Sequence, residues 1–239
     1  MARRRRRVAD LQLCGGRYWV RTSNPFTLKL GDNVTSVWDS YLATSSSDWS
    51  QSTVLDTTIV AGAATGGQCG ATSGRVEVCN STYGNNGWLG LASISITGGT
   101  HITQGTVKLN DTYFNTAQYN TPAWRNMVMC QEVGHTFGLA HQDEDFTNAN
   151  LNTCMDYTNL PESNQHPNAH DYDQLVSIYS HLDTTTTVGM SVAKGKPQVG
   201  NAPSSWGTLV SGNAHEGAAT YVRDFGGGNK VVTHVLWAN

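Results

Sequence analysis

The stretch MCQEVGHTFGLAH constrains the fold of this 239-residue chain more than any other feature. On a helix, side chains four positions apart lie on one face, so Gln131 and His135 point the same way with Glu132 beside them. Gly138 is suited to end that helix, and the following turn can bring His141 back toward His135. Two imidazoles and a third nitrogen or oxygen ligand are the ligand count of an open catalytic zinc site.

This pattern resembles the signature of the metzincin metalloproteases, HExxHxxGxxH, of the matrixin and astacin type. Glu132, His135, Gly138 and His141 match its fixed positions, and Gln131 stands where the family has its first zinc-binding histidine. The resemblance implies Zn²⁺ as cofactor, His135, His141 and Gln131 as metal ligands, and Glu132 as the general base for a metal-activated water. An amide oxygen is a poorer zinc donor than imidazole, so Gln131 predicts weaker metal binding unless another group helps.

The downstream segment CMDY lies at a distance that fits the methionine turn of the same family. The resemblance implies that Met155 lies beneath the metal. Tyr157 matches the position where astacin-like and serralysin-like members place a tyrosine near the metal, and it would complete the coordination or hydrogen-bond the tetrahedral intermediate. Asp143 is a weaker substitute ligand.

The remaining periodicity predicts an α+β fold of the α/β-sandwich type, with a twisted mixed sheet, the active-site helix and the methionine turn. By analogy with the family, the strand at 91–97 would be the edge that pairs with an extended substrate chain. Helices are expected at 33–50, 123–138 and 170–182, and strands at 54–61, 75–79, 89–97 and 102–109.

Composition divides the chain into four parts. Residues 1–17 are expected to be an unstructured leader, and residues 18–182 a metzincin-like catalytic domain. A shift to Thr, Gly, Ser, Pro and Lys marks a linker at 183–205. The segment 206–239 reads as a small accessory β segment of unknown role, with two strands around a glycine turn. No stretch approaches the apolar length of a transmembrane helix.

Charge argues against nucleic-acid binding. The formal net charge is -3, and five of the fifteen basic residues form the run from Arg3 to Arg7, so the rest of the chain is acidic. Such a body repels phosphate backbones. The arginine run resembles the start of a secretory signal, but the apolar stretch after it is too short, so the signal is incomplete.

Five cysteines leave Cys14 odd and the other four in two local pairs. Pairing Cys69 with Cys79 would close a glycine-rich hairpin, and pairing Cys130 with Cys154 would tie the motif helix to the CMDY turn. A structural zinc site is the alternative, but no C-x-x-C spacing is present. We therefore favour disulfides and a secreted, extracytoplasmic protein.

The leading hypothesis is a monomeric zinc-dependent endopeptidase that hydrolyses peptide bonds in a peptide or protein substrate. The alternative is a non-catalytic metzincin-like binding module that has lost tight metal binding through Gln131. A third interpretation is a structural surface protein built around the C-terminal β segment. The acidic run Asp143, Glu144 and Asp145 is interpreted as a solvated loop. A Ca²⁺ site is the minor alternative, since the spacing of these residues matches no standard calcium loop.

Overall fold

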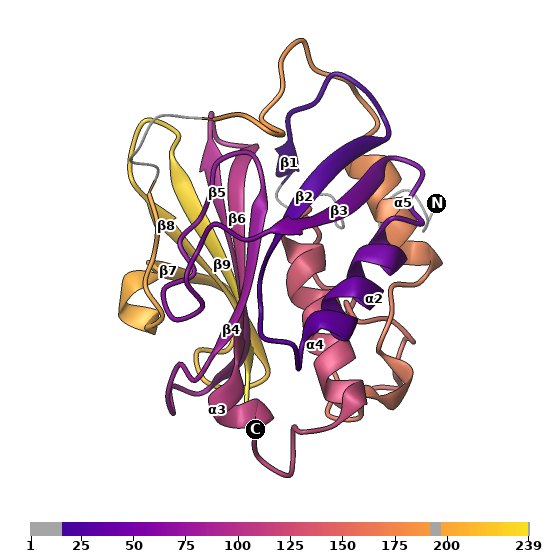
Figure 1. Cartoon of the computed structure of the whole chain (residues 1–239), viewed down its shortest axis with the longest axis vertical. Helices are drawn as coiled ribbons and strands as arrows, with labels where there is room; N and C mark the ends of the chain where they lie inside the picture. The colour runs from indigo at the N-terminus through magenta and orange to yellow at the C-terminus, as the bar shows by residue number, and fades with distance from the viewer. Residues whose placement is uncertain (1–15, 192–196, 239) are drawn as a thin grey trace.

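The computed structural model of the protein describes residues 16–191 and 197–238. One mixed sheet and a set of helices on one side of it form the main architecture (Figure 1). In chain order the elements are β1 (Tyr18–Trp19), β2 (Phe26–Asn33), α2 (Asp39–Trp49), β3 (Leu55–Ala61), β4 (Val76–Ser81), β5 (Trp88–Thr97), β6 (His101–Asn110), α3 (Asp111–Phe114), α4 (Pro122–His135), η1 (Pro161–Ser163), α5 (Ala169–Ile178), η2 (Pro203–Ser205), β7 (Thr208–Gly212), β8 (Ala218–Asp224) and β9 (Lys230–Trp237).

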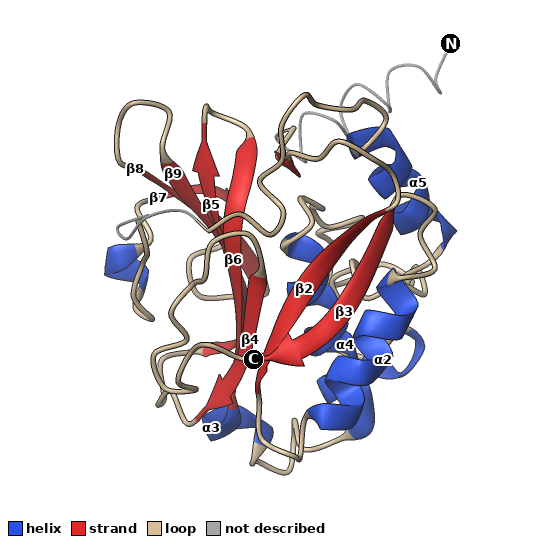
Figure 2. Cartoon of the chain, turned by 45° about the horizontal axis from the view of Figure 1, so that its top comes forward, coloured by secondary structure: helices blue, strands red, loops and turns tan. Residues whose placement is uncertain are grey.

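The strands form a nine-stranded sheet in the order β3-β2-β4-β6-β5-β9-β8-β7, and β1 pairs with β6 beside this path. Strands β3, β2, β4 and β6 run parallel, whereas every pairing from β6 to β7 is antiparallel. Helices α2, α4 and α5 lie together on one side, as Figure 2 shows. The chain therefore has the predicted mixed α+β architecture.

The N-terminal part contains two strands outside the predicted set, the short β1 and the longer β2. Strand β2 was not expected, although Phe26, Leu28 and Leu30 alternate with exposed residues and are buried against the helices. This strand takes Asn33, so the helix predicted at 33–50 begins only at Asp39. The prediction of a helix at residues 33–38 is wrong: Asn33 is the last residue of β2, whose apolar side chains alternate with period two, and residues 34–38 form the connection to α2.

The C-terminal strands change the position of β5. Strand β9 pairs antiparallel along the side of β5 that β6 leaves free, from the pair Gly90 and Leu236 to the pair Ile96 and Lys230. The prediction that 91–97 is a sheet edge is therefore wrong. Residues 206–239 contain the expected pair of strands and an additional one, β7, and all three extend the same sheet.

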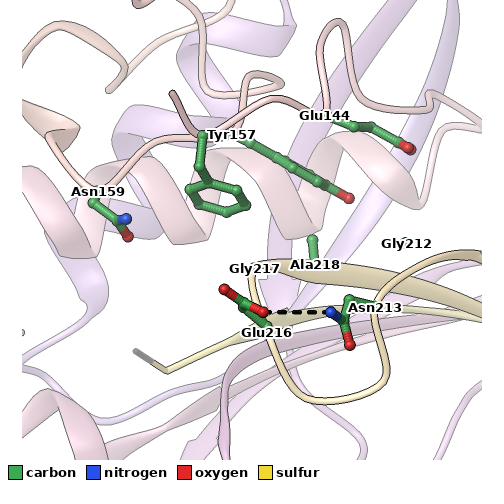
Figure 3. Close-up of a pocket in the computed structure, with 9 residues that line it drawn as sticks. Glu144, Tyr157, Asn159, Gly212, Asn213, Glu216, Gly217 and Ala218 are labelled. Atoms are coloured by element: carbon green, nitrogen blue, oxygen red, sulfur yellow. Dashed lines mark hydrogen bonds between the residues drawn. The ribbon is translucent and has the colours of Figure 1, made fainter. Parts of the chain in front are cut away.

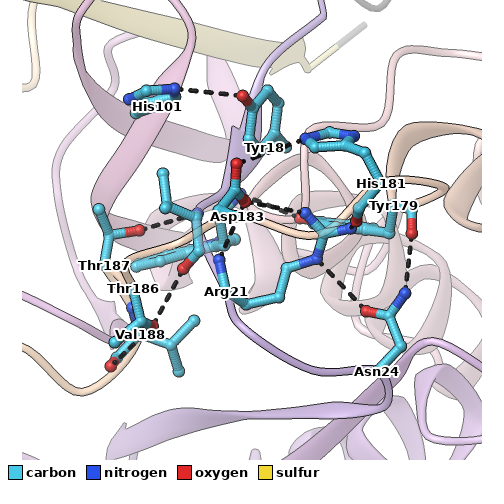
Figure 4. A network of polar contacts seen from close by, with 12 residues as sticks. Tyr18, Arg21, Asn24, His101, Tyr179, His181, Asp183, Thr186, Thr187 and Val188 are labelled. Atoms are coloured by element: carbon cyan, nitrogen blue, oxygen red, sulfur yellow. Dashed lines mark hydrogen bonds and ion pairs between the residues drawn. The ribbon is translucent and has the colours of Figure 1, made fainter.

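The expected linker at 183–205 lies against the rest of the protein where it is described. Asp183 forms an ion pair with the buried guanidinium of Arg21 at 3.2 Å, and the backbone amide of Thr187 donates to the Val20 carbonyl at 2.8 Å (Figure 4). Farther along, the Trp206 ring is buried on the face of the sheet opposite α4 and lies 5.9 Å from the ring of Trp237. The contact of Trp206 packs the segment before β7 against β9.

Both predicted disulfides are present. Cys69 pairs with Cys79, and Cys130 pairs with Cys154, each with 5.9 Å between the Cα atoms. Such bonds persist in oxidising compartments, which agrees with an extracytoplasmic protein. Cys14 and most of the predicted leader lie outside the described residues. Within residues 16–191 and 197–238, no helix is long and apolar enough to cross a membrane.

Candidate functional site

Helix α4 carries the motif and is fixed at both ends. Thr121 caps its first turn by accepting a hydrogen bond from the Trp124 amide at 3.2 Å, and Pro122 occupies the first helical position. The helix ends at His135, and Gly138 follows with φ +94°. A Cβ atom at residue 138 would overlap the Arg17 carbonyl oxygen, so the turn that returns the chain toward the helix requires glycine.

That turn brings His135 and His141 together. Their Nε2 atoms lie 3.0 Å apart, and both rings are buried. His135 Nδ1 donates to the Leu139 carbonyl oxygen at 2.9 Å, which leaves the Nε2 lone pair directed at His141. Two imidazoles bound to one tetrahedral zinc ion at about 2.0–2.1 Å place their nitrogen atoms about 3.3 Å apart. The two predicted ligands are therefore close to the separation that a shared ion requires.

Glu132 lies on the face of α4 that meets the sheet. Its side chain is 0 % exposed and passes so close to β5 that a Cβ atom on Gly90 would stand 2.6 Å from Glu132 Oε1. Among the described residues, neither carboxylate oxygen has a hydrogen-bond partner of normal geometry. Burial raises the pKa of Glu132 well above its ordinary value, and the backbone of Ala92 offsets part of that rise.

Gln131 lies next to the CMDY turn. Its Nε2 donates to the Cys154 carbonyl oxygen at 2.8 Å, and the disulfide of Cys154 with Cys130 holds the same two segments together. Its Oε1 is buried and has no partner within the described part of the chain. The amide is thus anchored through its nitrogen, and its oxygen is left for another ligand.

Met155 packs against α4 at Gly134. It is fully buried, and a Cβ atom on Gly134 would stand 2.8 Å from Met155 Sδ. The Met155 carbonyl oxygen accepts from the Gln142 amide at 2.6 Å. This contact joins the turn to the segment directly after His141.

Tyr157 contacts His141, with 4.2 Å between the ring centroids and an interplanar angle of 66°. It lines a hollow of about 540 Å³ between the loop after α4 and the turn that joins β7 to β8 (Figure 3). Glu144 and Glu216 also line this hollow, which we call the Tyr157 hollow. Burial raises the pKa of Tyr157, and the charges of Glu144 and Glu132 add to the rise, so the hydroxyl stays protonated at neutral pH.

The acidic run after His141 has separate partners. Asp143 Oδ1 accepts from the Asp145 amide at 2.6 Å, and Asp145 Oδ1 accepts from the Thr147 amide at 2.8 Å. Glu144 accepts a hydrogen bond from the Ser211 hydroxyl in β7 at 3.2 Å. These bonds define local turns and a link to the C-terminal strands, and they do not bring the three carboxylates to one point.

A residue outside the predicted site, His234, reaches the two histidines from the C-terminal strand β9. Its ring stacks on the ring of His135, with 4.1 Å between centroids and an interplanar angle of 6°, and lies 6.2 Å from the ring of His141. The signal in the sequence was a histidine in phase with Val232 and Leu236, which are both buried. The histidine therefore faces the core, where an imidazole needs a partner.

Burial also controls the charge of these three imidazoles. It lowers the pKa of His135 to about 4, despite the opposing hydrogen bond to Leu139. It lowers the pKa of His141 well below the ordinary value, and the adjacent His135 adds to the effect. The pKa of His234 is lowered in the same way, by burial first and then by the charges of His135, His141 and Arg17. All three rings are neutral at pH 7, the form that binds metal.

A second hollow, of about 520 Å³, opens beside the histidines and is lined by His141, Glu144, Val210, Thr220 and His234. We call it the His234 hollow. Within residues 16–191 and 197–238, no three His, Cys, Asp or Glu side chains stand in a ready metal-binding arrangement. The convergent Nε2 atoms and the unpartnered oxygens of Gln131 and Glu132 nevertheless fit a cation and a water molecule in chemical type.

No model of a known protein family matches the chain, and no curated protein matches its sequence.

Proposed function

We propose that this protein is a zinc-dependent endopeptidase of the metzincin type. The observation that carries the proposal is the pair of buried Nε2 atoms 3.0 Å apart, one turn of helix from a buried carboxyl group that has no hydrogen-bond partner of normal geometry among the described residues. A structural role explains neither feature well, because burial of neutral imidazoles and a carboxyl group costs free energy that an apolar core would avoid.

The two histidines would hold the metal ion. His135 is oriented by its Nδ1 hydrogen bond to Leu139, which is the backbone support that zinc-binding imidazoles commonly have. His141 Nε2 points at His135 Nε2, so the proton between them would be displaced by the ion. When bound, zinc lowers the pKa of water to about 7 and polarises the substrate carbonyl group.

Glu132 would transfer the proton. Its raised pKa brings proton binding nearer to neutral pH, where a carboxyl group can both accept a proton from water and return it to the leaving amine. Gly90 supports this role because its missing side chain leaves room for the carboxyl group. Tyr157, with its hydroxyl protonated, would donate a hydrogen bond to the developing oxyanion or complete the coordination.

The peptide or protein substrate would enter through the Tyr157 hollow and the His234 hollow, which share Glu144. The family resemblance would place an extended substrate along the side of β5 that faces away from β6, but β9 occupies that side. The substrate must therefore approach between the loop after α4 and the strands β7 and β8. The two disulfides favour action outside the cytoplasm.

A non-catalytic binding module is the second candidate, and the Gln131 contact favours it. Gln131 uses its amide nitrogen to hold the Cys154 carbonyl, so it has a structural function that needs no metal. The hollows beside His141 and Tyr157 would then bind a partner chain without cleaving it.

Metal content and peptide cleavage separate the two candidates. The purified full chain should retain about one zinc ion through dialysis at neutral pH and cleave a quenched fluorescent peptide library. Glu132→Ala should lower kcat by roughly 10²–10⁴-fold. The exposed Glu162 provides the control, and Glu162→Ala should cleave like the parent. A parent without zinc, or Glu132→Ala with parental activity, would reject the peptidase.

A further inference from the structure

A third imidazole reaches the candidate metal site from the C-terminal strand. In the antiparallel pair of β5 and β9, His234 stands opposite Ala92, and paired residues of two strands point to the same face of a sheet. Gly90 lies two residues from Ala92 in β5, and that face meets Glu132 of α4. His234 is thus placed on the wall opposite the motif helix by the sheet register.

Its contacts point inward to the two motif histidines. The ring of His234 is 5 % exposed and lies 4.1 Å from the ring of His135. Its Nδ1 is 3.1 Å from the hydroxyl of Thr220 in β8, the residue paired with it in the sheet. This contact holds one ring nitrogen, and a hydrogen bond on one nitrogen is how an imidazole is oriented when its other nitrogen binds a metal.

The motif helix leaves a vacancy in the ligand set that His234 can fill. An open catalytic zinc site has three protein ligands, most often imidazoles, and α4 with its turn supplies two. Gln131 stands at the third position with its Nε2 bound to the Cys154 carbonyl and its Oε1 directed elsewhere, but a neutral amide oxygen is a poorer zinc donor than imidazole. His234 brings an imidazole, the better zinc donor, to a ring-centroid distance of 4.1 Å from His135.

The stacked position of His234 is not yet a coordinating position. Imidazole lone pairs lie in the ring plane, and two rings with an interplanar angle of 6° cannot direct both lone pairs at one ion between them. The ring of His234 must therefore turn out of the stack when the ion enters. The open His234 hollow beside the ring provides space for that rotation.

We propose that His234 is the third imidazole ligand of the metal ion and replaces the histidine that Gln131 displaces in the motif. The C-terminal strands β7 to β9 are then part of the metal site and not an accessory segment. This inference rests on the proposed zinc site, but it concerns a residue outside the motif and is tested by metal binding rather than by cleavage.

The test uses the full chain, stripped of metal by chelation and titrated with Zn²⁺ alone. His234→Ala should weaken zinc binding by at least ~100-fold, because loss of a mere outer partner already costs 10–100-fold. The matched control is His215→Ala, which removes an exposed histidine from the turn between β7 and β8 and should bind zinc like the parent. Far-ultraviolet circular dichroism checks that each variant is folded.

A second variant gives a signature that a structural role would not produce. With Co²⁺ as the probe, His234→Cys should show a new thiolate-to-cobalt charge-transfer band that the parent lacks. Zinc bound equally well by the parent and His234→Ala, or the absence of that band in folded, cobalt-loaded His234→Cys, overturns the inference and leaves the peptidase proposal intact. Faster cleavage by zinc-loaded His234→Ala would show that His234 obstructs the active site, and this result would also overturn the inference. No zinc in the parent would reject both proposals.

Discussion

Replacement of Glu132 by methionine should stabilise the metal-free protein while it abolishes cleavage. The carboxyl group is 0 % exposed, and within the described residues neither oxygen has a hydrogen-bond partner of normal geometry. A buried group in this state costs ~1–3 kcal/mol, and an apolar side chain of similar length removes that cost. We therefore expect Glu132→Met to raise the free energy of unfolding by about that amount at pH 4.

The stability difference between Glu132→Met and the parent should grow with pH, because folding raises the pKa of Glu132. Because folding raises the pKa of Glu132 above 4.5, the folded parent binds more protons than the unfolded chain above that pH. The stability of the parent therefore falls as pH rises, by at most about 1.4 kcal/mol per pH unit from this group. Glu132→Met lacks this dependence, so the difference between the two proteins widens from pH 4.5 toward the raised pKa.

Urea unfolding of the metal-free parent and Glu132→Met at half-unit steps from pH 4 to pH 8 measures this difference. The subtraction cancels the titration of the three buried histidines, which both proteins share. The exposed Glu162 again serves as control, and Glu162→Met should give a difference near zero at every pH. A Glu132→Met protein that is less stable than the parent, or a difference that shrinks as pH rises, would refute the assignment of a buried, unpartnered carboxyl group.

Two further predictions concern packing and charge around the site. Gly134→Ala should destabilise the protein by about 1–3 kcal/mol in urea unfolding, because the added Cβ would stand 2.6 Å from Trp49 Cζ2 and 2.8 Å from Met155 Sδ; a more stable variant would contradict this packing. Burial lowers the pKa of Lys108 to about 8, so its ammonium group is stabilised less in the folded protein than in the unfolded chain at every pH below 8. Lys108→Met should therefore raise the free energy of unfolding by ~1–2 kcal/mol at pH 7, a value that already subtracts the lost hydrogen bond to Asn201. This increase should disappear by about pH 10.5, where the lysine is uncharged in the folded protein and half-charged in the unfolded chain. An advantage that persists unchanged at pH 10.5 would show that charge burial is not its cause.

Local sequence signals were sufficient for the start of the motif helix and for the disulfides, whereas the helix ends at His135, three residues before the predicted end at Gly138. Thr121 and Pro122 mark the start of α4, and the glycine at 138 marks the turn that returns His141 to His135. These features depend on residues within a few turns of one another. The pairing of Cys130 with Cys154 was equally accessible, because a short loop closes easily once the helix and the CMDY turn are in place.

Strand order was not accessible in the same way. The strand at 91–97 was correctly predicted as a strand but wrongly as an edge, because the partner on its far side, β9, lies at the end of the chain. Alternation within a strand reports which face is buried and not which strand lies beside it. The unexpected strand β2 is a different case, since Phe26, Leu28 and Leu30 carried the signal in their spacing.

The sequence by itself determined the chemistry that one helix and its turn can present: a glutamate, two histidines brought together by a glycine, and a glutamine where a third imidazole was expected. Only the tertiary structure decided which residues from other segments contact these four side chains. The register of β9 against β5 places His234 on His135, and the Cys154 carbonyl takes the Gln131 amide. The physical reason is that side-chain spacing acts over a few residues, whereas sheet pairing joins segments far apart in the chain and is fixed by the packing of the whole core.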